Sequence, residues 1–101
     1  MVFRAYTTLL SKTDFSETDM VKIVSEMYKG DLVQNISKIT VFKKNSLFDG
    51  KHEYIVNFDI TVDDSVGYYE LAMYLADSQN SYTKSSGNYF FLKTFPAIEQ
   101  K

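Results

Sequence analysis

The stretch HEYIVNFDI, residues 52–60, alternates large apolar side chains with smaller or polar ones, an alternation typical of a half-buried β-strand. Because successive side chains of a strand point to opposite faces of its sheet, this strand has two chemically different faces. One face carries only aromatic and aliphatic residues, namely Tyr54, Val56, Phe58 and Ile60. The other face carries Glu53, Ile55, Asn57 and Asp59. We predict that the first face lies in the core beneath helices and that the second face stays open.

The strongest helix signal in the chain lies upstream, between residues 15 and 30. Ser16 can cap a helix and is followed three positions later by Asp19, at the spacing of a capping box. Apolar residues then recur at the spacing of one helical face, at Met20, Ile23, Val24 and Met27. Gly30 stands where a left-handed residue often ends a helix. The pattern predicts an amphipathic helix over 17–29.

The other segments complete a mixed pattern of strands and helices. Runs rich in β-branched and aromatic residues predict four strands, over 2–10, 36–44, 52–62 and 89–95. Residues 45–50 are expected to form the turn of a hairpin, and Pro96 is expected to halt the last strand. A second helix is predicted over 66–77, and a polar, mobile loop over 78–88 is expected to follow it. The residues that offer caps for this helix are Asp63, Asp64 and Ser65.

The predicted element order is βαββαβ, which is the order of the ferredoxin-like fold. Such a chain forms a four-stranded antiparallel sheet with two helices on one face, and right-handed crossovers place the first and third strands in the middle. The predicted fold class is therefore α+β. With 101 residues, of which 45% are hydrophobic, the chain is expected to form a single domain over 1–101.

The residue inventory argues against catalysis. There is no Cys, and the one histidine, His52, has no partner residues in a recognisable catalytic or metal-binding motif. We therefore expect no enzymatic activity, no cofactor and no bound metal. The first residues, MVFRAYTTLL, lack the features of a secretory signal, and no apolar run is long enough to span a membrane. A cytoplasmic protein without membrane contact is expected.

The predicted second helix is apolar almost all round, although a helix at the surface of a small domain normally has a polar outer face. Residues 52–83 also carry six carboxylates without a Lys or Arg. A surface rich in Tyr and Met with an acidic rim suits a basic protein partner. The alternatives are a wide buried stripe and an ordinary solvated charged face. The residues predicted to bind the partner are Asp63, Asp64, Tyr68, Tyr69, Glu70, Met73, Tyr74 and Asp77.

A second hypothesis places single-stranded RNA or DNA on the open face of the sheet, where aromatic side chains would stack bases and cations would neutralise phosphates. The residues of this hypothesis are Arg4, Tyr6, Lys38, Phe42 and Lys44. The carboxylates of Glu53 and Asp59 on the same face would repel phosphate, and the net charge of −2 gives no overall attraction, so nucleic acid is the less favoured partner. A homodimer that covers this face is a further expectation, with Tyr6, Phe42 and Ile55 in the contact.

The composition is rich in Lys, Asn, Tyr and Phe and poor in Ala and Arg, which is typical of small accessory proteins of tailed phages. On that association we expect a small non-enzymatic protein-binding module that inhibits or retunes a host protein. An anti-CRISPR or another anti-defence role is among the options. No motif in the sequence selects the partner.

Overall fold

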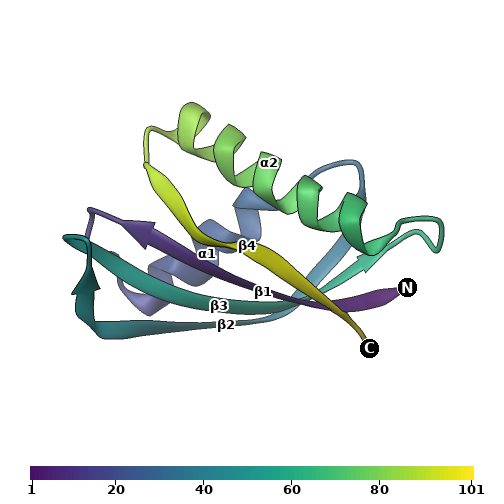
Figure 1. The fold of residues 1–101 in the computed structure, drawn as a ribbon. Helices are drawn as coiled ribbons and strands as arrows, with labels where there is room; N and C mark the ends of the chain where they lie inside the picture. Colours follow the sequence, from purple (N-terminus) through teal and green to yellow (C-terminus); the bar gives the residue numbers. More distant parts are fainter.

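The computed structural model describes all residues from 1 to 101 and contains six elements of secondary structure (Figure 1). The strands are β1 (Val2–Ser11), β2 (Val33–Phe48), β3 (Lys51–Val62) and β4 (Phe90–Gln100). The helices are α1 (Glu17–Met27) and α2 (Tyr68–Ser86). This order, βαββαβ, confirms the predicted ferredoxin-like α+β fold.

The four strands form one antiparallel sheet in the order β2-β3-β1-β4, with the first and third strands in the middle as predicted. Both helices pack on one face of this sheet, and their apolar side chains belong to the same core cluster as those of the strands. Helix α1 lies nearer β2, and α2 lies nearer β4. The opposite face carries no helix, and we call it the open face.

The apolar face of β3 lies in the core, as its alternation predicts. Its side chains are fully buried, and Phe58 stacks on Tyr28 with ring centroids 5.1 Å apart. The other strands and the helices contribute the buried residues Phe3, Ala5, Leu9, Met20, Val24, Met27, Leu71 and Leu75. Three further residues of the helical and strand patterns pack partly buried against this cluster, namely Ile23, Ile39 and Val41. The aromatic residues of β3 are therefore core residues and do not form a base-stacking platform.

Helix α1 begins as predicted but ends earlier. Ser16 accepts a hydrogen bond from the backbone N–H of Asp19 at 3.0 Å, and this bond caps the helix. The last helical residue is Met27 instead of residue 29.

Gly30 does not have the left-handed conformation that we predicted for it. Its role is to give room to Tyr74 of α2, whose hydroxyl donates a hydrogen bond to the carbonyl of Tyr28 at 3.1 Å. A side chain at position 30 would overlap that hydroxyl, so this close approach of α2 to the end of α1 requires a glycine.

The hairpin between β2 and β3 has a two-residue turn, shorter than the turn predicted over 45–50. Asp49 and Gly50 both have a positive φ, of 51° and 73°, as a type I′ turn requires. Because this turn follows the twist of the flanking strands, their pairing continues up to Phe48 and Lys51.

Helix α2 runs through most of the segment 78–88, so the prediction of a loop there is wrong for most of its length. Gln79 explains the extension, because its buried side chain donates a 2.6 Å hydrogen bond to the carbonyl of Phe90. Tyr82 also packs against the ring of Phe90. Serine and asparagine have weak helix propensity, but these tertiary contacts outweigh it. Gly87, with a φ of 78°, ends the helix.

The start of α2 also differs from the prediction. Its N-cap is Gly67, which has no side chain to accept a hydrogen bond. The carboxylate of Asp63 accepts one from the N–H of Ser65 at 3.0 Å, in the turn before the helix. Asp77, which we expected near the C-terminal end of the helix, lies in its middle, so the helix dipole has little effect on its charge. Neither helix has the length and apolar character that crossing a membrane requires.

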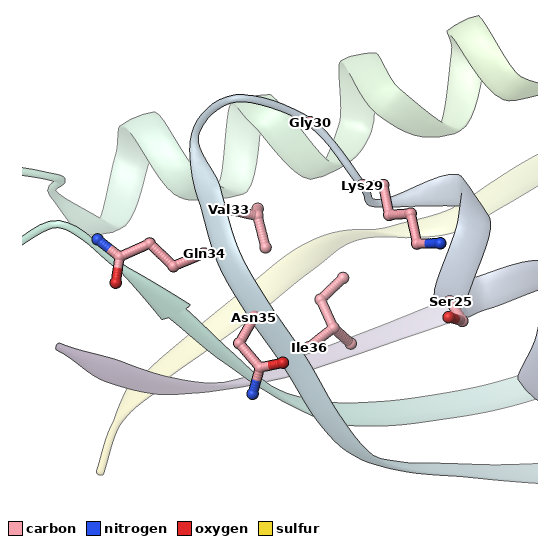
Figure 2. Close-up of a pocket in the computed structure, with 7 residues that line it drawn as sticks. All are labelled: Ser25, Lys29, Gly30, Val33, Gln34, Asn35 and Ile36. Carbon is pink, nitrogen blue, oxygen red and sulfur yellow. The ribbon is translucent and has the colours of Figure 1, made fainter.

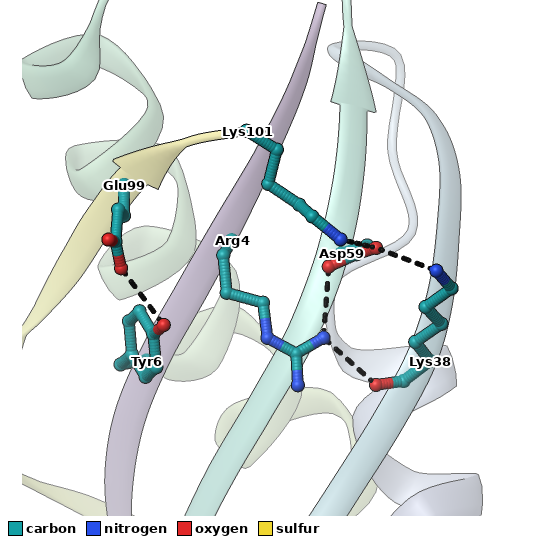
Figure 3. Close-up of polar contacts among 6 residues, drawn as sticks. All are labelled: Arg4, Tyr6, Lys38, Asp59, Glu99 and Lys101. Atoms are coloured by element: carbon teal, nitrogen blue, oxygen red, sulfur yellow. Dashed lines mark hydrogen bonds and ion pairs between the residues drawn. The ribbon is translucent and has the colours of Figure 1, made fainter.

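Strand β4 continues past Pro96, where the sequence predicts an end. Because β4 is an edge strand, the missing N–H of the proline interrupts no inner ladder. Pairing with β1 is irregular here, with a register shift between Tyr6 and Thr8. The continued strand brings Glu99 and Lys101 to the open face (Figure 3).

The burial of one face of β3 can be tested by replacing Phe58 with alanine. We expect Phe58→Ala to lower the free energy of unfolding by about 3–5 kcal/mol, because the change leaves a cavity in a packed core. Ile55→Ala on the open face of the same strand is the control, with an expected loss of about 1 kcal/mol. Urea unfolding followed by circular dichroism measures both values. Equal losses would contradict our assignment of the two faces.

The anchoring of the end of α2 can be tested at Gln79. We expect Gln79→Ala to lower the free energy of unfolding by about 1–3 kcal/mol, because the carbonyl of Phe90 loses its buried partner. Asn80→Ala changes the next, exposed residue and should not destabilise the protein. Hydrogen exchange of the amides of residues 78–86 should become faster in the Gln79 variant alone. Unchanged exchange there would mean that another contact holds these turns.

Candidate functional site

The open face has an uncharged middle. Cross-strand partners point to the same face of a sheet, so the strand register defines which residues lie there. We call this middle the central band, and it comprises Tyr6, Thr8, Thr40, Phe42, Ile55, Asn57, Thr94 and Ala97. Its large side chains are exposed, with Phe42 at 58%, Tyr6 at 38% and Ile55 at 37%. The central band is therefore an uncharged surface with exposed apolar side chains and without a helix over it.

At one end of the central band, the carboxylate of Asp59 is buried among cations (Figure 3). Its oxygen Oδ1 accepts a hydrogen bond from Arg4 at 2.9 Å, and Oδ2 accepts one from Lys101 at 2.8 Å. The ammonium of Lys38 lies 3.9 Å from Oδ2. The hydrogen bonds from Lys101 and from Arg4 hold the pKa of Asp59 below its usual value. We call these four residues the Asp59 cluster.

A bulge in β2 shapes the Asp59 cluster. Lys38 has a φ of 52°, and the register between β2 and β3 shifts between Ser37 and Thr40. The carbonyl of Lys38 accepts a hydrogen bond from Nη1 of Arg4 at 3.3 Å. Both the backbone and the side chain of Lys38 therefore contact the cluster.

At the other end of the central band, the carboxylate of Glu53 is buried in the same way. Its oxygen Oε2 accepts a hydrogen bond from Lys93 at 3.1 Å, and the ammonium of Lys44 lies 3.8 Å away. Lys93 also stands 4.4 Å from the centre of the Phe48 ring, which is a cation–π contact. We call Lys44, Glu53 and Lys93 the Glu53 cluster.

The structure gathers the cations of the nucleic-acid hypothesis on the open face, but each has a carboxylate beside it. Arg4 and Lys38 belong to the Asp59 cluster, and Lys44 belongs to the Glu53 cluster. We expected both carboxylates to be displayed on this face, and they are instead buried beneath cations from the neighbouring strands. The physical reason is that a carboxylate in the middle of a sheet needs a charged partner.

The two aromatic residues of the nucleic-acid hypothesis are not neighbours. Tyr6 lies on β1 and Phe42 lies on β2, with β3 between them. The hydroxyl of Tyr6 donates a hydrogen bond to Glu99 at 2.9 Å, and this bond raises the pKa of Tyr6 (Figure 3). A carboxylate thus stands beside one of the two proposed stacking platforms.

Sequence reasoning missed three charged residues of the open face: Lys93, Glu99 and Lys101. Lys93 lies within the predicted last strand, and the other two follow Pro96, where we expected that strand to end. The partial burial of Ile98 between exposed neighbours, which is the pattern of a continuing strand, is visible only in the structure.

The residues predicted to bind a partner on α2 divide into exposed and packed ones. Tyr69 is 75% exposed, and Glu70 and Asp77 are exposed as well. Met73 is half-buried. These four residues offer an apolar and acidic surface along α2.

Tyr68 and Tyr74 both make packing contacts within the fold, although Tyr68 remains 49% exposed. The ring of Tyr68 packs edge-on against Phe3 with centroids 5.3 Å apart, and its hydroxyl donates a hydrogen bond to Gln100 at 3.1 Å. Tyr74 fills the space beside Gly30. The surplus of tyrosine on this helix is therefore explained in part by packing.

The acidic area around α2 is smaller than the six carboxylates of residues 52–83 suggested, because Glu53 and Asp59 lie on the open face. Asp64 pairs with the ammonium of Met1 at 2.9 Å, and a hydrogen bond from the backbone of Ser65 lowers the pKa of Asp63. We call the remaining surface the α2 surface, and it comprises Asp63, Asp64, Tyr69, Glu70, Met73 and Asp77.

Two hollows flank the loop after α1. The first, of about 330 Å³, lies between the end of α1 and the start of β2 (Figure 2). It is lined by Ser25, Lys29, Gly30, Val33, Gln34, Asn35 and Ile36. The second, of about 420 Å³, lies between α1 and α2 and shares Lys29 and Gly30 with the first. Both linings are mostly polar, and the second includes Glu26, Asp77 and three serines.

No protein-family model matches the chain, and neither a curated protein nor a solved structure matches it. The fold class is therefore assigned from element order and sheet topology. Function is inferred from the chemistry of the two surfaces described above.

The buried charge of Asp59 should make stability depend on pH. Its pKa is lower in the folded protein than in an unfolded chain, where it is about 3.9. The charge therefore stabilises the fold above that pH, and its contribution is lost as the pH falls through the lower, folded value. We expect the free energy of unfolding of Asp59→Asn to be lower than that of wild type at neutral pH.

The expected pH profiles separate this effect from general acid unfolding. The free energy of unfolding of Asp59→Asn should fall less steeply than that of wild type below about pH 5. Asp77→Asn, which changes an exposed carboxylate of α2, is the matched control and should keep the wild-type profile. Urea titrations across the pH range measure the free energy of unfolding of wild type and of both variants. A wild-type slope in Asp59→Asn would contradict the prediction.

Proposed function

We propose that this protein is a small non-catalytic module that binds another protein, and that the α2 surface is where a basic partner docks. The observation that carries the proposal is Tyr69, which is 75% exposed in the first turn of α2 and is followed directly by Glu70. Tyr69 has the largest exposed fraction of the exposed large hydrophobic side chains, and Tyr is enriched in interface cores.

The two kinds of residue on the α2 surface have different roles in the proposal. Tyr69 is the energetic anchor, because a few aromatic residues dominate most interfaces. Glu70 and Asp77 form the rim, which attracts a basic partner and speeds its encounter. Binding of this kind would inhibit or retune the partner by covering part of its surface.

The composition of the chain supports a setting for this function. It resembles that of accessory proteins of tailed phages, so the partner is proposed to be a host protein, with components of antiviral defence among the candidates. Nucleic acid on the open face is less well supported, because the central band between the two cation clusters holds no cation to meet successive phosphates.

The experiment has two stages. The chain is used to capture proteins from the native host, and the captured protein is identified by mass spectrometry, expressed and purified. Direct titration then compares wild type with Tyr69→Ala. We expect the dissociation constant to rise by about 30-fold, which corresponds to the roughly 2 kcal/mol of a hot-spot residue.

Tyr89→Ala is the matched control, because Tyr89 is a similarly exposed tyrosine outside the α2 surface. It should bind as wild type does. Glu70→Lys with Asp77→Lys should mainly slow association and reduce the salt dependence. If Tyr69→Ala and the Glu70→Lys, Asp77→Lys double variant both bind as wild type does, while Lys43→Ala with Lys44→Ala abolishes binding, the partner docks on the β2–β3 hairpin. The proposed placement would then be wrong.

A further inference from the structure

The open face has an excess of positive charge, although the whole protein has a net charge of −2. The Asp59 and Glu53 clusters together hold five cations against two carboxylates. This leaves three positive charges in excess, and Glu99 beside Tyr6 offsets one of them. The open face is therefore basic, whereas the carboxylates of the α2 surface make that side acidic.

The buried carboxylates hold these cations in place. Lys101 and Arg4 donate to Asp59 at 2.8 and 2.9 Å, so their positions are fixed before any ligand arrives. Lys38 lies at 3.9 Å and its side chain remains 72% exposed, so it keeps donors free for an outside acceptor. Preorganisation of this kind lowers the entropy that a charged contact loses on binding.

The two clusters are separated by an apolar interval. Asp59 and Glu53 stand six positions apart on β3, which corresponds to about 20 Å along the strand. The central band fills the interval, and its exposed Phe42 and Ile55 need apolar cover. A matching ligand has carboxylates at both ends of a span of about 20 Å and apolar side chains between them.

We propose that the open face is a second docking surface, distinct from the α2 surface, and that it takes an acidic protein segment with apolar side chains between its carboxylates. The partner's carboxylates would pair with the excess cations of the Asp59 and Glu53 clusters. Its apolar side chains would cover Phe42, Ile55 and Tyr6. This inference does not rest on the proposed function of the α2 surface, which lies on the other side of the sheet.

The charge layout favours a protein segment over a nucleic-acid strand and over a second copy of this chain. A nucleic-acid strand carries phosphate at every step, whereas the central band has no cation to meet it. Tyr6 and Phe42 stand two strands apart, about 10 Å, too far for stacking successive bases. Two copies of the chain placed face to face would bring positive clusters together. The homodimer remains a prediction, with this repulsion against it.

The test uses the full chain and defined probes. The first probe is a synthetic peptide with paired glutamates at each end of an alternating Leu/Ser run that spans about 20 Å. The same peptide with glutamine in place of glutamate is the charge control, and single-stranded oligothymidine is the nucleic-acid probe. Fluorescence titration measures each, and light scattering of the protein alone reports self-association. We expect the glutamate peptide to bind and the uncharged glutamine peptide to show no binding.

Variants locate the binding. Lys38→Ala with Lys44→Ala should weaken binding of the glutamate peptide at least about tenfold, the loss of one or two charge-assisted contacts. The fold should survive, because Arg4, Lys101 and Lys93 still pair the carboxylates. Lys22→Ala with Lys84→Ala removes two exposed lysines from the helices and should bind as wild type does. Circular dichroism confirms that each variant is folded.

Several results would overturn the proposal. Equal binding of the two peptides, or equal affinity of the two double variants, would show that the clusters do not recognise carboxylates. Tighter binding of oligothymidine than of the glutamate peptide, lost in Lys38→Ala with Lys44→Ala, would assign the face to nucleic acid. A doubled mass in light scattering that falls in Phe42→Ala would assign it to a second copy. None of these results affects the test at Tyr69.

Discussion

A carboxylate buried in the middle of a sheet destabilises the fold unless cations accompany it, and strand β3 carries two such carboxylates. Asp59 has its cations from three places in the chain, Arg4 in β1, Lys38 in β2 and Lys101 after β4. One side chain of β3 therefore connects the whole width of the sheet. The strand order is held by apolar packing on one face and by ion pairing on the other.

This arrangement explains why the two faces of a small protein can differ so strongly. The helices cover the apolar face of β3, and their outward carboxylates leave that side acidic. The open face needs cations for its buried carboxylates, and more cations than carboxylates gather there. The opposite charges of the two sides thus follow from where the sheet hides its own acidic residues, and they give each side a different class of partner.

The predicted elements with local signals agree with the structure, because those signals arise between near neighbours in the chain. The alternation of β3 and the cap at Ser16 are examples. The extension of α2 was missed because it depends on the carbonyl of Phe90, and the extension of β4 was missed because Pro96 is tolerated only at a sheet edge. Neither contact leaves a pattern in the sequence around the residue concerned.

The candidate surfaces could be predicted only in part for the same reason. Arg4 and Lys101 lie 55 and 42 residues from Asp59 in the sequence, so no spacing rule connects them. Tyr68, Tyr69 and Tyr74 are alike in the sequence, and tertiary packing alone distinguishes Tyr69, the most exposed of the three. Each edge strand of the sheet also lacks one free backbone donor, because Pro96 on β4 has no N–H and the N–H of Lys43 on β2 donates a hydrogen bond to Glu17 at 2.9 Å. An extended strand that approached either edge would meet this gap in the donors, which opposes the strand-by-strand stacking from which fibrils grow.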